Sequence, residues 1–155
     1  MNRDYDIIVV GAGPAGSTAA EHVVLNGSRV LVIEKRKEIG VPVACGEFLP
    51  DVHEVKSIFP RAEGVDELLD VPSSLISRHM DMFRLFGPGD RSWDVPFSGF
   101  TTDRDRFDQY LASKAKKAGA EILMTTRCLS VNDNEVNTNN GVFQAKVIIG
   151  ADGPL

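Results

Sequence analysis

A glycine-rich turn between two apolar runs constrains the fold of this chain more than any other feature. The first run covers residues 5–10, the turn GAGPAG covers residues 11–16, and the second run, residues 29–33, ends at Glu34. A G-x-G-x-x-G turn after a strand and before a helix, with an acidic residue about twenty positions later, is the fingerprint of dinucleotide binding. A glycine turn in an ordinary strand–helix unit would not need all of these parts together. The sequence therefore predicts a βαβ unit over residues 5–34 that binds a dinucleotide.

Each part of this turn has a physical role in holding a pyrophosphate. Gly11 permits the tight turn, Gly13 lets the backbone approach the ligand, and Gly16 lets helix and strand pack closely. The helix N-terminus offers N–H groups and a positive dipole to phosphates, and Pro14 fits a first turn that needs no N–H. The carboxylate of Glu34 can accept hydrogen bonds from both hydroxyls of an adenosine ribose. The residues assigned to this site are Gly11, Gly13, Pro14, Ala15, Gly16 and Glu34.

The composition is typical of one soluble globular domain and excludes several classes of protein. Of the 155 residues, 43% are hydrophobic and 25% are charged, and the net charge of −5 argues against a nucleic-acid partner. Cys45 and Cys128 are too isolated for a disulfide scaffold or a metal site, so we expect no metal and a reducing, cytoplasmic setting. Asp4 and Asp6 stand where a signal peptide needs basic residues.

The remaining apolar and turn patterns predict an α/β order of elements. They indicate a helix over 14–25, a loop over 35–50, short helices within 51–69, a hairpin over 80–97, a helix from Thr102 or Asp103 to about 118 with Phe107, Leu111, Ala115 and Ala118 on its buried face, a strand over 121–125, an antiparallel meander over 129–143 with a turn at 139–141, and a strand over 145–149. The last strand is almost wholly apolar, which predicts a buried position in a parallel sheet. Few residues follow it, so we expect the front part of a longer, truncated protein, whose exposed strand edge would cause self-association. A complete minimal domain is the alternative.

Three segments in a fixed order give the chain a family resemblance. They are the fingerprint over 11–34, the sequence DRDRFD at 103–108, and GADGP at 150–154. With them the chain resembles FAD-dependent oxidoreductases of the glutathione-reductase-like fold, in the branch of aromatic hydroxylases, flavin halogenases and geranylgeranyl reductases. The sequence PVACGE at 42–47 is similar to the P-x-x-C-G element of geranylgeranyl reductases.

The resemblance implies a particular architecture. It is an FAD/NAD(P)-binding Rossmann-like three-layer β/β/α domain with a parallel sheet, an antiparallel β-meander and an inserted hairpin. Residues 1–155 would be its N-terminal part, and residues 72–100 would begin the β-sheet of a substrate domain.

The resemblance also implies further contacts with FAD. Arg104 would reach the cofactor, where the alternative is a solvated cluster with neighbouring acids. The backbone at Cys128 would contact the adenine, where the alternative is core packing. Cys45 would lie near the flavin as a candidate catalytic residue that assists protonation, where the alternative is a small apolar filler. The implied cofactor contacts are Lys35, Cys45, Gly46, Arg104, Cys128, Asp152 and Gly153.

By the same resemblance, the whole enzyme would reduce isoprenoid C=C bonds by hydride transfer from reduced FAD. Reduced nicotinamide or ferredoxin would supply the electrons, and a polyprenyl lipid substrate would bring a peripheral membrane contact. A flavin monooxygenase or halogenase is the alternative enzyme, because residues 46–50 also match a halogenase stretch. A non-catalytic, truncated nucleotide-binding remnant is the third alternative, and the isolated chain is expected to be inactive.

Overall fold

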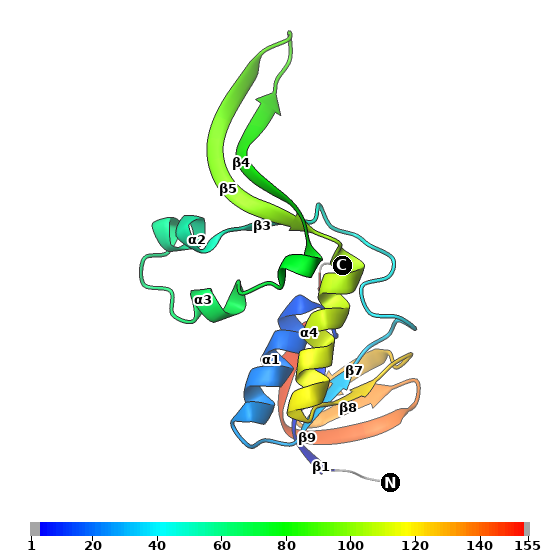
Figure 1. Ribbon diagram of the computed structural model, residues 1–155. Helices are drawn as coiled ribbons and strands as arrows, with labels where there is room; N and C mark the ends of the chain where they lie inside the picture. Colours follow the sequence, from blue (N-terminus) through cyan, green and yellow to red (C-terminus); the bar gives the residue numbers. More distant parts are fainter. Residues whose placement is uncertain (1–3, 154–155) are drawn as a thin grey trace. The chain divides into compact units, whose positions relative to one another are not determined.

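The computed structural model describes residues 4–153 and divides the chain into two units (Figure 1). The first unit contains the residues up to 43 together with those from 107 onward, and the second contains residues 44–106. In chain order the elements are β1 (Asp4–Val10), α1 (Pro14–Leu25), β2 (Val30–Ile33), β3 (Phe48–Pro50), α2 (Val52–Ile58), α3 (Val65–Leu68), the 3₁₀ turn η1 (Ser73–Leu75), β4 (Ile76–Phe86), β5 (Ser92–Thr102), α4 (Arg104–Ala118), β6 (Glu121–Leu123), β7 (Cys128–Asn132), β8 (Glu135–Thr138) and β9 (Gly141–Gly150).

The first unit is built on a six-stranded sheet in the order β6-β2-β1-β9-β8-β7. Strands β6, β2, β1 and β9 are parallel neighbours, whereas β9, β8 and β7 form an antiparallel meander. Strand β9 belongs to both parts, because residues 141–144 pair with β8 and residues 144–150 pair with β1. The expected strand over 145–149 is therefore the second half of one longer strand.

The buried position expected for residues 145–149 is not reached within the described residues. Among the residues that the structure describes, the part of β9 beyond residue 144 pairs with β1 alone, and Val147 is 51% exposed.

Two apolar clusters lie on opposite faces of the parallel strands and give the unit three layers. All four residues of β2 are buried, as in a strand covered on both faces. Val30 and Val32 pack with Ala20 of α1 and Ala115 of α4, whereas the alternate residues of β2 pack toward Val136 of the meander. The helices α1 and α4 lie side by side (Figure 1). This arrangement confirms the expected β/β/α order of layers.

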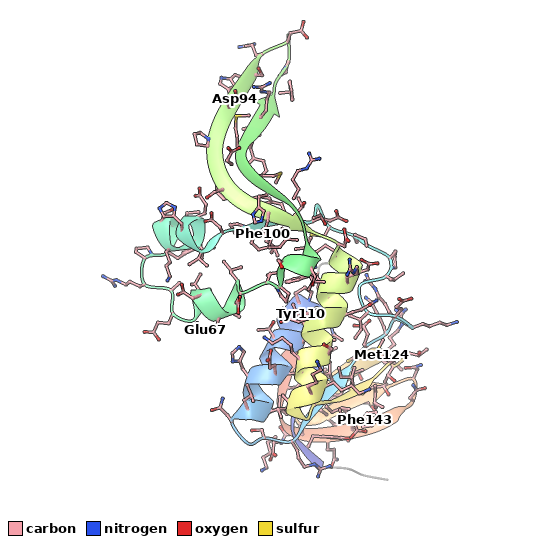
Figure 2. All side chains as sticks on the ribbon, in the orientation of Figure 1. Glu67, Asp94, Phe100, Tyr110, Met124 and Phe143 are labelled. Carbon is pink, nitrogen blue, oxygen red and sulfur yellow. The ribbon has the colours of Figure 1, made fainter. Side chains whose placement is uncertain are left out.

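The second unit contains a three-stranded antiparallel sheet in the order β3-β5-β4. The β4–β5 hairpin extends beyond the expected residues 80–97. In the outer part of this hairpin, where Figure 2 labels Asp94, Arg84 forms a 2.6 Å ion pair with Asp94. The rings of Phe48, Phe83 and Phe97 pack together with centroids 4.7–5.7 Å apart. The assignment of residues 72–100 to a substrate domain stays a prediction.

Two details of the expected elements are wrong. The buried face of α4 includes Asp108 and Ala112, whereas Leu111 and Ala118 are only half-buried. Strand β6 ends at Leu123, two residues earlier than expected. Of the two alternative caps of α4, Asp103 directly precedes the helix, whereas the buried Oγ1 of Thr102 has no hydrogen-bond partner among the described residues.

Candidate functional site

The glycine turn after β1 has the close contacts that its sequence predicts. Gly11 has a φ of +106°, and a Cβ on it would overlap the carbonyl oxygen of Ala151. A Cβ on Gly16 would overlap the carbonyl oxygen of Gly11. A Cβ on Gly13, by contrast, would meet no described atom within 4 Å. Packing thus requires Gly11 and Gly16. Gly13 instead leaves space in which the protein backbone can approach a ligand closely.

The helix that follows this turn begins in a way that suits an anion. Gly13 is the N-cap of α1 in an extended conformation, no side chain caps it, and the first turn contains no acidic residue. Pro14 occupies the first turn, and the first helical hydrogen bond runs from Ser17 N to Gly13 O at 2.9 Å. A helix N-terminus of this kind presents backbone N–H groups and positive dipole to a phosphate.

Glu34 connects the end of β2 to the glycine turn. Glu34 is 7% exposed, and its Oε2 accepts a 2.8 Å hydrogen bond from the backbone N–H of Ala12. Its Oε1 accepts another, also 2.8 Å, from the N–H of Arg36. Each carboxylate oxygen still has capacity for a second donor, so ribose hydroxyls can add to these contacts. Sequence reasoning assigned Glu34 to a ribose and missed its bond to Ala12.

A cavity of about 750 Å³ opens beside Glu34 within the first unit. Its walls come from the C-terminal ends of β1, β2 and β9 and from the residues around β7. Among the residues that sequence reasoning proposed, it brings together Gly11, Glu34, Lys35, Cys128 and Asp152. It also includes residues that sequence reasoning missed, namely Thr126, Arg127 and Lys146. This is where ligands of open α/β sheets bind, beyond the carboxyl ends of the strands.

Two further proposed residues are Cys128, which lines this cavity, and Gly153, which follows the lining residue Asp152. Burial first, and the charge of Asp152 second, raise the pKa of the Cys128 thiol. Its Sγ lies 3.8 Å from the carbonyl oxygen of Ser130. Because a protonated thiol is a poor nucleophile, Cys128 suits a cavity wall better than covalent chemistry. Gly153 follows Asp152 with a φ of +80°.

The other proposed residues lie in the second unit. Cys45 is a free, exposed thiol, and Gly46 is exposed beside it. Arg104 begins α4, and the neighbouring Arg106 lies 3.6 Å from the carboxylate of Asp103. The contacts of Cys45, Gly46 and Arg104 with a cofactor stay predictions.

Between residues 4 and 153 the structure contains neither a candidate metal site nor a candidate membrane-spanning helix. No three histidine, cysteine or acidic side chains there form a group that could hold a metal ion. No helix in that part of the chain is both long and apolar enough to cross a membrane.

Comparison with known proteins gives the family. The model of the family described as FAD dependent oxidoreductase matches residues 6–153. The chain belongs to the FAD-dependent oxidoreductases. The Rossmann-like fold with its parallel sheet and meander, and FAD as the cofactor of the family, agree with the expectation from the sequence.

Individual relatives of this chain include reductases named for isoprenoid lipids. The chain is 44% identical to an uncharacterized protein in the nifH2 5′ region of Methanosarcina barkeri, over 97% of this chain and 83% of that protein. It is 38% identical to the digeranylgeranylglycerophospholipid reductase of Thermoplasma volcanium, over 96% of this chain but 39% of that enzyme. The chain thus spans about two-fifths of the length of the reductases it matches.

Solved structures show the same relationship. A geranylgeranyl bacteriochlorophyll reductase-like protein from Thermoplasma acidophilum superposes with a TM-score of 0.78 and 32% identity, over 99% of this chain and 40% of that one. The myxobacterial chondrochloren halogenase has a TM-score of 0.69 at 22% identity, over 97% and 38%, and shares the fold.

Proposed function

We propose that this chain holds the adenosine diphosphate part of FAD at the cavity of its first unit. One observation carries the proposal. The 2.8 Å hydrogen bond from Ala12 N–H to Glu34 joins the pyrophosphate-type turn and the ribose-type carboxylate at the edge of a single cavity. Spacing alone predicts each of these two parts, and their junction gives them the geometry of one binding site.

The residues present fit the cofactor. The open space at Gly13 and the uncapped start of α1, with Ala15 and Gly16, would receive the pyrophosphate. Glu34 would accept the ribose hydroxyls, and Lys35 and Cys128 would flank the adenine. Bound FAD would supply the hydride chemistry, while the protein binds it, orients it and limits competing reactions. The residues that we assign to the remaining parts of FAD are Cys45, Gly46, Arg104, Asp152 and Gly153.

For the reaction, we propose the reduction of C=C bonds in an isoprenoid lipid, with this chain as the FAD-binding part of the reductase. Support comes from relatives named digeranylgeranylglycerophospholipid reductase at 38%, 36% and 34% identity. Cys45 would stand beside the reacting bond, and reduced nicotinamide or ferredoxin would supply the electrons. We place this protein in the cytoplasm, where a lipid substrate would bring a peripheral membrane contact. For the halogenase alternative, the solved halogenase structure supports a shared fold alone.

Titration of the apo-chain with FAD, followed by quenching of flavin fluorescence, tests the proposed site. Gly13→Ala is a sharp variant, because its new methyl group meets no described atom within 4 Å. We expect it to unfold at the temperature of the wild type and to bind FAD at least tenfold more weakly, which is about 1.4 kcal/mol. Equal FAD affinity in the two proteins would remove the turn from the cofactor site.

A further inference from the structure

Residues 125–127 form a constrained segment between β6 and β7, at the wall of the cavity. Thr125 has a φ of +56°. Positive φ is a true outlier for a β-branched residue, and such a conformation persists only where its surroundings hold it. After it come Thr126, Arg127 and Cys128, all of which line the cavity. The turn at Thr125 therefore sets where this part of the cavity wall lies.

One side of this segment is bonded to the strand end that carries Glu34. The N–H of Thr125 donates to the carbonyl oxygen of Arg36 at 3.0 Å. The N–H of Thr126 donates to the carbonyl oxygen of Glu34 at 2.8 Å. The backbones of residues 34–36 and 125–126 are thus held together by two direct bonds, and these fix Glu34 beside Thr126.

The other side is held by two asparagine side chains from the β8–β9 turn. The Oδ1 of Asn139 accepts a 2.6 Å hydrogen bond from the N–H of Arg127, and its Nδ2 donates to the carbonyl oxygen of Thr125 at 3.3 Å. The Nδ2 of Asn140 donates to the same carbonyl oxygen at 3.3 Å and to the Oγ1 of Thr126 at 2.8 Å. Both backbone groups of Thr125 are thereby occupied.

A hairpin turn by itself does not need these contacts. The turn conformation requires glycine only at Gly141, whose φ is +123°. The two amide side chains instead make four hydrogen bonds to residues 125–127. Thr126 is 2% exposed, and its hydroxyl donates to the carbonyl oxygen of Met124 at 3.0 Å. The same hydroxyl accepts its hydrogen bond from the Nδ2 of Asn140.

We propose that Asn139 and Asn140 are positioning residues of the cofactor site. Their side-chain amides lock the turn at Thr125 and so hold the cavity wall over residues 126–128 beside Glu34, where the adenosine of FAD would bind. This inference rests on the proposed function, because the wall matters for binding only if the adenosine occupies this cavity. Neither asparagine needs to touch the cofactor.

The test compares three variants of the chain with the wild type. Asn139→Ala combined with Asn140→Ala removes all four bonds. Asn139→Asp keeps an acceptor for the N–H of Arg127, but it replaces the donor to Thr125 with a carboxylate oxygen that repels the same carbonyl oxygen. Asn26→Ala is the matched control, because the Nδ2 of Asn26 also donates to one carbonyl oxygen, that of His22 at 2.8 Å, at the far end of α1. Each protein is titrated with FAD and with ADP, and hydrogen exchange is measured on the apo-chain.

We expect the double variant to bind both FAD and ADP about three- to tenfold more weakly, the effect of one ordinary hydrogen bond's net free energy. The two ligands should weaken by the same factor, because the change is confined to the part they share. Amide exchange should speed up at residues 125–128, and Asn139→Asp should fall between the double variant and the wild type. Asn26→Ala should change neither ligand affinity nor this exchange.

The outcomes separate this inference from the proposed function. A wild-type chain that binds neither FAD nor ADP would overturn the proposed function, and the inference with it. A wild type that binds both, beside a double variant with unchanged affinities, would overturn the inference alone. So would a loss of FAD affinity with ADP affinity intact, or an equal loss in Asn26→Ala.

Discussion

At the level of single residues, the carboxylate of Glu34 is the point on which the candidate site converges. It accepts hydrogen bonds from the backbone at Ala12 and at Arg36, so its position and that of the glycine turn depend on each other. A residue that fixes the turn and would also bind the ribose should be costly to remove, because two N–H donors, one of them buried, lose a charged acceptor.

Glu34→Ala should therefore weaken FAD binding by about 1.5–3 kcal/mol, the range for hydrogen bonds to charged groups. Titration of apo-protein with FAD measures the change, and urea unfolding of the same samples shows how much of it reflects the loosened turn. Glu34→Gln is the companion variant, since its amide has one acceptor oxygen for two N–H groups. Unchanged FAD affinity in the alanine variant would place Glu34 outside the site.

Cys128 offers a chemical readout of the cavity. Its pKa is raised, so at a given pH less of it is thiolate than of an ordinary cysteine, and iodoacetamide should modify it slowly. The alkylation rate of Cys128 should rise with pH, but at higher pH values than for an ordinary cysteine. Asp152→Asn should speed the alkylation, because it removes a negative charge that disfavours the thiolate. Saturating FAD should slow it further. Mass spectrometry after timed alkylation follows Cys128 and the exposed Cys45 separately, and equal rates at the two thiols would contradict the expectation.

At the level of elements, the two tight glycines of the turn, Gly11 and Gly16, have a packing role. Gly16→Ala would drive a methyl group into the carbonyl oxygen of Gly11, between α1 and β1. We expect a loss of about 1–3 kcal/mol in the free energy of unfolding, the usual cost of overpacking. Urea unfolding measures it, and Gly13→Ala serves as the control with no such overlap. Equal stability of the two variants would refute the packing role.

The short helix α2 depends on a titrating cap. The Oδ1 of Asp51 accepts a 2.9 Å hydrogen bond from the N–H of Glu54. The hydroxyl of Ser98 first, and the Glu54 N–H second, hold the pKa of Asp51 below its ordinary value. A lowered pKa in the folded state means that this stabilisation is complete above the unfolded value and is lost as pH falls through the folded one.

Asp51→Ala should accordingly lower the free energy of unfolding by about 1 kcal/mol near neutral pH. The difference from the wild type should shrink in acid, below about pH 4. Asp51→Asn keeps a capping oxygen that does not titrate, so it should stay close to the wild type at both pH values. Urea unfolding at the two pH values decides, and a difference that grows in acid would reverse the argument.

For the molecule as a whole, apolar side chains remain exposed along the second half of β9 and on the meander. Val147 is 51% exposed on a strand with β1 as its partner in that half, and Leu129 on β7 is 63% exposed. Unpaired strand edges with apolar side chains recruit other chains. Sedimentation velocity should show association that increases with concentration, and Val147→Lys should reduce it. Leu25→Lys, at a 68% exposed position on α1, should leave the association unchanged. Equal effects of the two variants would exclude the edge of β9 as the site of association.

The parts of this fold that could be predicted are those whose signal is local. The βαβ unit follows from the glycine spacing and the apolar runs beside it, and α1 begins and ends where they indicate. The contacts of Asn139 and Asn140 could not be predicted, because they join residues at least twelve positions apart. The continuity of β9 was missed because the polar Gln144 separates the end of the expected meander at residue 143 from the apolar run over 145–149. Along a strand, such a residue simply points away from the core.

The double membership of β9 carries a consequence for how sequences of this kind can vary. The turn at Asn139 and Asn140 sets the register of β9 on β8, and the same strand then carries that register into its pairing with β1. One residue inserted in this turn would exchange the faces of Ile148 and Ile149, which pack on opposite sides of the sheet. Evolution should therefore permit length changes at the exposed hairpin tip around Gly89 and forbid them at residues 139–141.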